Sequence, residues 1–240
     1  MEELKKLYIV GAGGFGREVA WLVERINAVN PTWNLVGFLD DNETIHGKLE
    51  DEYPVLGGCS YLADTNEECW VVCAVGSSKV RKKIIEKLRG YANVKFATLI
   101  DPSVIISKRV SIGEGTIICA GTIVTVDITI GSHVIINLDC TIGHDAVLQD
   151  CVTLYPSVNV SGNCTIGECV ELGTGMQIIQ GRSVVKDTIV GAGAVVVKDL
   201  EEKGTYVGVP ARKISYSMEM SEIEEDIQNW EKLKKEHKAK

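Results

Sequence analysis

Residues 135–150 read IINLDCTIGHDAVLQD, and this stretch belongs to a repeat that sets the fold of about half of the chain. Stepping by six from Ile100 gives seventeen consecutive positions ending at Val196, and each of them holds isoleucine, leucine or valine. A second series, four residues after each member of the first, is small or apolar except at Arg182. A period of six fits neither the 3.6-residue period of an α-helix nor a simple hairpin meander. It predicts a parallel β-helix, in which short strands meet at corners and each coil stacks on the last.

The repeat also predicts the size of this β-helix and the position of its one histidine-acid pair. Its 97 residues, at 18 per coil, give a little over five coils, stacked roughly 4.8 Å apart. His144 is the third residue of its hexapeptide and stands between the inward-facing Ile142 and Ala146, so we expect it on the outside of a coil, near a corner.

The residue after the aliphatic one is often glycine, and we expect these glycines to supply the unusual backbone angles of tight corners. They are Gly113, Gly131, Gly143, Gly167, Gly173 and Gly191.

The amino-terminal part of the chain has a different pattern. Residues 7–26, LYIVGAGGFGREVAWLVERI, read as an apolar strand, a turn with the spacing G-x-G-x-x-G and an amphipathic helix. Such glycines let the backbone approach a phosphate at the helix amino terminus, where free N–H groups and the helix dipole favour anions. A second strand ends in Asp40 and Asp41, about where an acid would bind a ribose hydroxyl in a dinucleotide fold. A third strand, residues 70–76, leads into a helix over 78–90, which makes half of a mononucleotide-binding sheet. A purely structural turn would show the same glycines, so the motif alone leaves both interpretations open.

Composition excludes several classes of protein. A net charge of -8 and a pI near 5.1 provide no basic surface for nucleic acid. No apolar run approaches the roughly 20 residues that cross a bilayer, and the start MEELKKLYIV is too acidic for a signal peptide. The eight cysteines include no Cys-x-x-Cys pair, which favours reduced, buried thiols and no metal site. These observations predict a cytosolic protein that does not bind membranes.

Five segments together carry a resemblance to a known family: VGAGGFGREVA, GFLDD, AVGSSKVRKKI, GHDAVLQD and KGTYVGVPARKI, in this order. Over nearly all of residues 5–215 the chain resembles the sialic-acid O-acetyltransferase and nucleotide-sugar N-acetyltransferase group of hexapeptide-repeat acyltransferases. The resemblance implies an α/β half-Rossmann-like domain at residues 1–97, an all-β left-handed parallel β-helix at 98–215 and a carboxy-terminal helical tail at 216–240. The handedness comes from the resemblance, because the period of six does not give it.

The resemblance also implies an activity and a set of binding residues. It implies an acetyl-CoA-dependent N-acetyltransferase that acts on the amino group of a nucleotide-linked amino sugar, such as a 4-amino-4,6-dideoxy sugar, for bacterial glycan biosynthesis. Family members form trimers, with acyl-donor sites between neighbouring prisms. Carried over by motif, the nucleotide-sugar residues are Gly13, Gly14, Phe15, Asp40, Asp41 and Gly76, and the acetyl-CoA residues are Thr153, Gly162, Thr174 and Ala192.

The same resemblance assigns the catalytic pair. An imidazole with a pKa near 6.5 can accept the proton of an attacking amine at neutral pH, which predicts His144 as the general base. Asp145 would orient the ring and stabilise the imidazolium. Many family members carry a second histidine nine residues after the first, whereas this chain has Thr153 there. We expect His46 and His133 to be ordinary surface or loop residues.

Several alternatives remain open from the sequence. The nearest is a sugar O-acetyltransferase of the sialic-acid type. A non-catalytic nucleotide-sugar-binding protein would keep the glycine turn without needing the His144–Asp145 pair, and a repeat scaffold would need neither. The segment GVPAR, Gly208–Arg212, either turns along the CoA tail or only leaves the prism. The tail predicts a helix, with Ser221 and Glu224 forming a capping box, that packs on its own subunit or on a neighbour.

Overall fold

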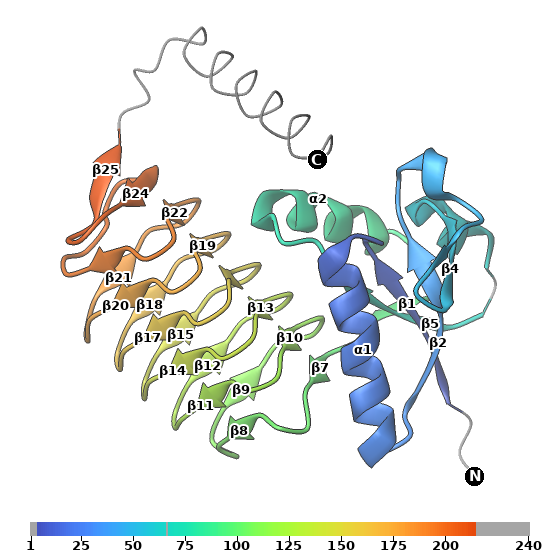
Figure 1. Cartoon of the computed structure of the whole chain (residues 1–240), viewed down its shortest axis with the longest axis horizontal. Helices are drawn as coiled ribbons and strands as arrows, with labels where there is room; N and C mark the ends of the chain where they lie inside the picture. Colours follow the sequence, from blue (N-terminus) through green and yellow to red (C-terminus); the bar gives the residue numbers. More distant parts are fainter. Residues whose placement is uncertain (1–3, 66, 215–240) are drawn as a thin grey trace, which may run out of the picture.

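An open α/β sheet packs against one side of a three-sided β-prism in the computed structural model (Figure 1). The structure describes residues 4–65 and 67–214. The helix predicted for the tail, residues 216–240, lies outside this range. Within the range, no helix has the length and apolar character to cross a membrane, and no three side chains of histidine, cysteine, aspartate or glutamate gather as a metal ion would require.

The amino-terminal domain is a six-stranded sheet in the order β3-β4-β2-β1-β5-β6, with only β3 antiparallel to its neighbour. Sequence patterning predicts β1, β2, β5 and both helices but misses β3, β4 and β6. Strands β3 and β6 have only two and three residues, and the five residues of β4 include a proline and a glycine, which are unfavourable in strands. The elements are β1 (Lys5–Val10), α1 (Gly14–Val29), β2 (Trp33–Leu39), η1 (Glu43–Ile45), β3 (Leu49–Glu50), β4 (Tyr53–Gly57), η2 (Cys59–Asp64), β5 (Cys69–Cys73), α2 (Ser78–Leu88) and β6 (Val94–Phe96).

The prism consists of three sheets, and from β7 to β23 their strands are parallel and pair residues 18 apart in sequence, as Ile117 is paired with Ile135. The first face contains β7 (Leu99–Ile100), β10 (Ile117–Ile118), β13 (Ile135–Ile136), β16 (Thr153–Leu154), β19 (Glu171–Leu172), β22 (Ile189–Val190) and the hairpin β24 (Thr205–Val207) and β25 (Arg212–Ile214). The second face contains β8 (Ile105–Ile106), β11 (Ile123–Val124), β14 (Thr141–Ile142), β17 (Asn159–Val160), β20 (Gln177–Ile178) and β23 (Val195–Val196). The third contains β9 (Ser111–Ile112), β12 (Thr129–Ile130), β15 (Val147–Leu148), β18 (Thr165–Ile166) and β21 (Ser183–Val184).

Both apolar series of the repeat form the interior of the prism, as predicted. In each two-residue strand the second residue points inward, and members such as Ile136, Leu154 and Val190 are completely buried. Free cysteines at all eight positions are buried too. Their burial raises thiol pKa values, that of Cys73 to about 12, so these groups are unreactive small side chains.

The corner glycines are required by close contact between coils and not, as predicted, by unusual backbone angles. Positive φ recurs at the fourth position of each hexapeptide, from Gly115 to Gly193 in steps of six, and aspartate is the most frequent non-glycine residue there. The glycines at the second position have ordinary φ, but a Cβ on Gly143 would stand 2.5 Å from the backbone nitrogen of Gly162 in the next coil. The prediction from backbone angles was therefore wrong. These glycines are needed because adjacent coils approach too closely for a side chain.

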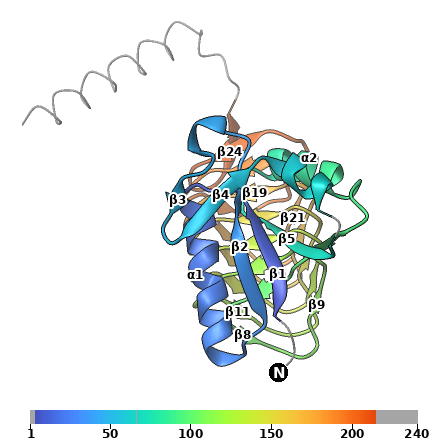
Figure 2. The same ribbon diagram turned by 90° about the vertical axis from the view of Figure 1, so that its right-hand side faces the viewer.

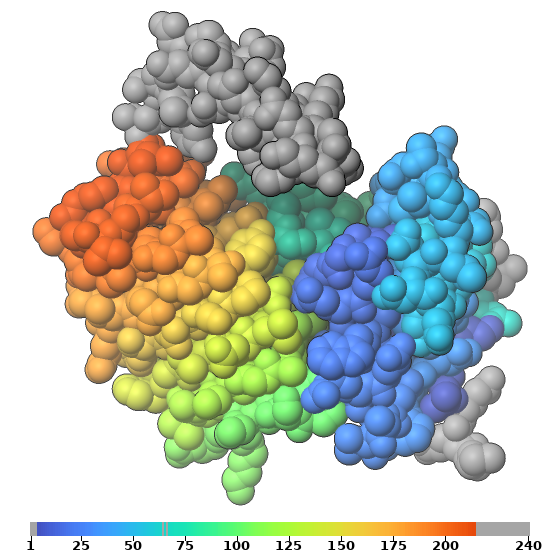
Figure 3. All heavy atoms as spheres, in the orientation of Figure 1, coloured from blue at the N-terminus to red at the C-terminus, as the bar shows by residue number. Residues whose placement is uncertain are grey.

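The two domains share one apolar cluster. Residues Val19 and Val23 of α1 belong to the same cluster as Leu99, Ile117 and Ile135 on the first face of the prism. Figure 2 views the sheet and α1 with the prism behind them, and Figure 3 shows α1, in blue, directly against the first coils, in green. Since this contact buries apolar surface on both domains, the first face is covered by the α/β domain of its own chain.

Candidate active site

The α/β sheet reverses its winding between β1 and β5, and the carboxyl ends of these two strands, with the turns that follow them, are termed the crevice. Strands β1 and β5 are neighbours, but α1 leads on to β2 on one side and α2 leads on to β6 on the other. Ligands of open α/β sheets bind at the carboxyl ends of strands at such a switch point. The glycine turn after β1 and Gly76 after β5 both lie at this edge, and a Cβ on Gly11 would stand 3.1 Å from the carbonyl oxygen of Ala74.

The glycine turn leaves its outer surface open. Neither Gly13 nor Gly14 would bring a Cβ within 4 Å of another group, and no side chain caps the start of α1 at Gly13. Gly16 is different, since its Cβ would overlap the carbonyl oxygen of Gly11 at 2.0 Å. Thus Gly16 closes the turn, while the free N–H groups at the start of α1 are available to an anion. Phe15 is half-buried and packs on the domain core.

The acidic pair after β2 borders the same turn. Asp40 accepts hydrogen bonds from the backbone N–H groups of Ala12, at 3.0 Å, and Asn42, at 2.9 Å. Asp41 accepts one from the N–H of Cys59 at 3.2 Å. His46 is a loop residue, as expected, and its Nε2 lies 2.7 Å from the carbonyl oxygen of Asp40. Asp40 therefore orders the glycine turn itself, in addition to any contact with a ribose.

The start of α2 is closed to anions by the prism. One carboxylate oxygen of Glu171 accepts from both the N–H and the hydroxyl of Ser78, at 2.8 and 2.9 Å. The other accepts from the hydroxyl of Tyr155 at 3.3 Å. Because a protein carboxylate already satisfies this helix terminus, a phosphate bound in the crevice is directed to the start of α1.

The predicted catalytic pair lies at the corner between the second and third faces. Nδ1 of His144 is 2.7 Å from Oδ2 of Asp145, and the two side chains are 52% and 58% exposed. A carboxylate only accepts, so Nδ1 carries the proton and Nε2 of the neutral ring is free to accept one. The ring packs over the next coil, where a Cβ on Gly162 would stand 2.5 Å from Nε2. Asp145 itself has φ of +59°, a conformation that aspartate adopts more readily than most residues.

The residues predicted to bind acetyl-CoA fall in three places. Gly162 lies beside the His144 ring. Thr174 and Ala192 stack one above the other at the corner between the first and second faces. Thr153 is only 1% exposed, and its hydroxyl donates to the carbonyl of Gly76 at 2.9 Å. The role of all four in binding the donor stays a prediction.

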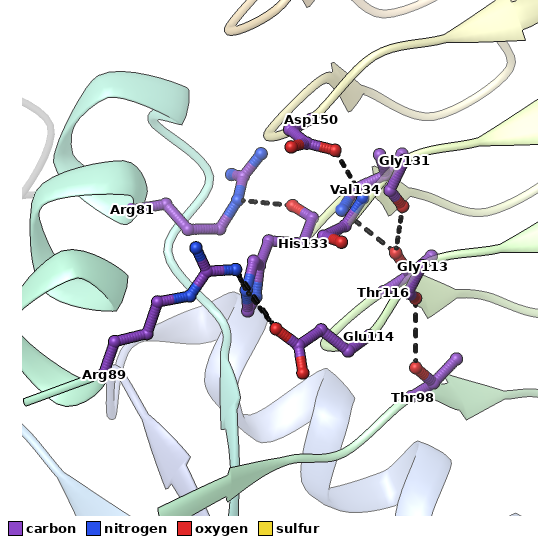
Figure 4. Close-up of polar contacts among 11 residues, drawn as sticks. Arg81, Arg89, Thr98, Gly113, Glu114, Thr116, Gly131, His133, Val134 and Asp150 are labelled. Atoms are coloured by element: carbon purple, nitrogen blue, oxygen red, sulfur yellow. Dashed lines mark hydrogen bonds and ion pairs between the residues drawn. The ribbon is translucent and has the colours of Figure 1, made fainter. Parts of the chain in front are cut away.

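His133 is not the surface residue that its sequence predicted. It is only 3% exposed and packs edge-on against Phe96, with ring centroids 4.6 Å apart. Figure 4 shows it beside Arg81 and Arg89, and it belongs to the corner between the third and first faces. Burial, followed by these two positive charges, lowers its pKa to about 4. The prediction failed because the α/β domain covers this corner, which a repeat pattern alone does not reveal.

Within one chain, the crevice and His144 lie on different sides of the prism. The α/β domain contacts the first face and the corner between the third and first faces, through pairs such as Lys82–Glu168 and Arg89–Glu114. His144 follows β14 of the second face and precedes β15 of the third, so it lies at the corner opposite the first face.

Sequence reasoning missed Arg81, Ser78, Tyr155 and Glu171. Arg81 is one of several basic residues in an amphipathic helix, and nothing in that pattern marks it as buried. Its side chain is nevertheless 1% exposed, and its five N–H groups face six oxygen atoms of the described chain, so that one proton of Nη2 is shared. Five of them are backbone carbonyls, which no sequence motif can indicate.

Known proteins share both halves of this architecture. Residues 6–88 match the family model described as the PglD N-terminal domain. The chain is 38% identical over 118 residues to UDP-N-acetylbacillosamine N-acetyltransferase of Bacillus subtilis (strain 168), a match that covers 49% of this chain and 52% of that relative. The match thus spans about half the length of this curated relative.

Solved structures extend the similarity to nearly the whole chain. The acetyltransferase domain of PglB from Neisseria gonorrhoeae has a TM-score of 0.81 and 32% identity, covering 88% of this chain and all of that one, and it has also been solved in complex with acetyl coenzyme A. Perosamine N-acetyltransferase from Caulobacter crescentus, a variant with one histidine replaced by asparagine, in complex with CoA and GDP-perosamine, has a TM-score of 0.78 and 29% identity, covering 89% of this chain and 98% of that one.

Proposed function

Because the chain belongs to the family of left-handed β-helix nucleotide-sugar N-acetyltransferases, we propose that it transfers the acetyl group of acetyl-CoA to the amino group of a nucleotide-linked amino sugar. The observation that carries this proposal is the His144–Asp145 pair, with Nδ1 held at 2.7 Å and Nε2 free. A non-catalytic nucleotide-sugar-binding protein has no need of such a pair. The relatives named for UDP-N-acetylbacillosamine and GDP-perosamine support a 4-amino-4,6-dideoxy sugar as the acceptor and bacterial glycan biosynthesis as the setting.

The proposed reaction is an acyl transfer through a tetrahedral intermediate. The neutral amine attacks the thioester carbonyl carbon, and Nε2 of His144 accepts the proton that the nitrogen loses as the new C–N bond forms. Asp145 stabilises the resulting imidazolium through Nδ1. The C–S bond then breaks, and His144 returns the proton to the departing CoA thiolate. The products are the amide and free CoA, and the base is regenerated.

The nucleotide part of the acceptor is assigned to the crevice of the α/β domain. The open glycine turn at Gly13 and Gly14 would hold the diphosphate, with Asp40 and Asp41 beside the ribose and Gly76 closing the far side. Glu171 at the start of α2 supports this placement, because it leaves α1 as the helix terminus open to phosphate. Acetyl-CoA would lie between neighbouring prisms, with Gly162 at one corner and Thr174 and Ala192 at another. Thr153, the fourth predicted contact, is buried under the α/β domain of its own chain.

A homotrimer completes this arrangement. The crevice and His144 lie on different sides of one prism, so an acceptor bound in the crevice would meet the histidine of a neighbouring subunit. The second face exposes apolar side chains suited to such an interface: Ile105 is 66% exposed and Ile123 38%. Light scattering should give about 78 kDa, three times the chain mass of 26.1 kDa. A stable and active monomer would contradict the trimer. We also propose that the protein is cytosolic.

The activity is tested by incubating the purified protein with acetyl-CoA and a panel of UDP-, dTDP- and GDP-linked 4-amino sugars, with sialic acid as the O-acetyl acceptor. Release of the CoA thiol with an amino sugar, and a product that resists hydroxylamine, would support the N-acetyltransferase. A hydroxylamine-labile ester would show O-acetyl transfer instead. Binding without turnover, in parent and His144→Ala alike, would indicate a nucleotide-sugar-binding protein.

A further inference from the structure

Helix α2 lies along the corner between the third and first faces and supplies hydrogen-bond donors to successive coils. Nε of Arg81 donates to the carbonyl of His133 at 3.0 Å, and Nη2 donates to that of Cys151 at 2.7 Å. In the next coil, the single hydroxyl proton of Ser78 is shared between the carbonyl of Cys169 and the carboxylate of Glu171, each 2.9 Å from Oγ. The three carbonyls belong to equivalent residues, 18 apart, with φ of +57°, +57° and +56°. Because buried carbonyls need donors, α2 is fixed in register with the coils.

The same guanidinium also holds the loop that follows β5. Nη1 of Arg81 donates to the carbonyls of Val75 and Gly76, at 2.7 and 3.0 Å. Nη2 donates to the hydroxyl of Thr153 at 2.8 Å, and that hydroxyl in turn donates to the carbonyl of Gly76 at 2.9 Å. Arg81, Thr153 and Gly76 thus form a closed triangle of hydrogen bonds between α2, the prism and the loop.

This triangle is buried and has little freedom to rearrange. Arg81 and Thr153 are each 1% exposed. Burial lowers the pKa of the guanidinium, whose charge is balanced by carbonyl dipoles. A buried cation held in this way is costly to displace, because moving it leaves a desolvated charge without partners. The backbone at Val75 and Gly76 is therefore fixed by hydrogen bonds on the side of the crevice that faces the prism.

We infer that Thr153, together with Arg81, is a positioning residue that fixes the Gly76 loop of the nucleotide-sugar site against the prism. The inference rests on the proposed function for the identity of the ligand, but the geometry of the triangle does not depend on it. Thr153 stands where many members of the resembled family have histidine, and a contact with acetyl-CoA is the competing role. Its hydroxyl is already occupied on both sides, by one donor and one acceptor, and its side chain is buried under Gly76.

The test compares Thr153→Val with Thr122→Val. Thr122 is a matched control, since it is fully buried in the prism and its hydroxyl donates to a carbonyl of the prism itself, that of Asn137, at 3.1 Å. Each change removes one buried hydroxyl at nearly constant volume. We expect Thr153→Val to raise KM for the nucleotide sugar about 3- to 10-fold, the effect of one ordinary hydrogen bond, with KM for acetyl-CoA unchanged. Thr122→Val should alter neither.

A second measurement needs no ligand and no turnover. Amide hydrogen exchange at residues 76–78 should become faster in Thr153→Val and remain at the parent rate in Thr122→Val. This result would support the positioning role even if the parent protein proved inactive as an acetyltransferase, so failure of the proposed function is distinguished from failure of the inference. Equal exchange in both variants, or a rise in KM for acetyl-CoA alone, would overturn the inference and return Thr153 to the donor site.

Discussion

Gly162→Ala should lower turnover by displacing His144, the proposed base, while leaving the fold intact. The added Cβ would stand 2.5 Å from Nε2 of His144, 2.7 Å from Cε1 and 2.9 Å from Cδ2. All three distances are well inside the roughly 3.5 Å at which non-bonded atoms pack comfortably. The backbone of Gly162 is not in the positive-φ region, so alanine is compatible with the local conformation. The imidazole is the group that must give way.

The magnitude follows from the size of that displacement. Restoring ordinary contact requires the ring to move by about 1 Å, and a misplacement of about 1 Å at a reacting group can lower the rate about 100-fold. The His144 side chain is 52% exposed, so the ring can swing into solvent without disturbing the prism interior. We therefore expect kcat to fall about 100-fold, with less than about 1 kcal/mol lost in the free energy of unfolding.

A double-mutant cycle on steady-state kinetics and thermal unfolding separates this effect from other roles of Gly162. If the methyl group acts only through the ring, Gly162→Ala has no further effect on kcat in a His144→Ala background. A direct contact with acetyl-CoA would instead raise KM for the donor equally in both backgrounds. Parent-like kcat in the single variant, with the oligomeric state of the parent retained, would refute the reasoning that Nε2 must stay where the structure places it.

The remaining predictions concern the base, the acidic pair and the buried histidine. His144→Ala should lower kcat about 10²- to 10⁴-fold, whereas Asp145→Asn should do less harm. Near-parent turnover in His144→Ala would show that the proton leaves through water. Asp40→Ala should weaken nucleotide-sugar binding by about 1.5–3 kcal/mol, seen as a rise in KM for the nucleotide sugar but not for acetyl-CoA. Equal rises in the two KM values would show that Asp40 has a structural role alone. Burial keeps His133 neutral, with a pKa of about 4 against 6.5 when exposed. Between these pH values the unfolded chain therefore binds more protons than the folded chain. The free energy of unfolding should have its full value above about pH 6.5 and fall by about 3 kcal/mol on acidification to about pH 4. Urea unfolding across that range tests this. The decline in stability should be shallower in His133→Asn than in the parent, and identical declines would show that His133 is not the cause.

The prism could be predicted from the sequence because its physics is local and periodic. Each coil buries its aliphatic residues against the next, so Ile136 or Leu154 must recur in every coil, and a period of six is visible without any knowledge of the chain's path. The outward-facing corner position of His144 follows from the same count. The glycine turn and the acids after the second strand were readable for a similar reason, since a strand, turn and helix are contiguous in sequence.

What the tertiary structure decided is which surface of the repeat the other domain covers. The six-residue pattern is the same on all three faces, so it cannot distinguish His133, which is buried under α2, from His144, which is exposed. Arg81, Thr153 and Glu171 acquire their partners only when α2 packs on the prism, because those partners are backbone carbonyls and residues some 50 to 90 positions away in sequence. The second-position glycines show the same limit: their cause is the distance between coils, which no single hexapeptide contains. Periodic burial is repeated along the chain and can be read from it, whereas a contact made once, between distant segments, exists only after folding has brought them together.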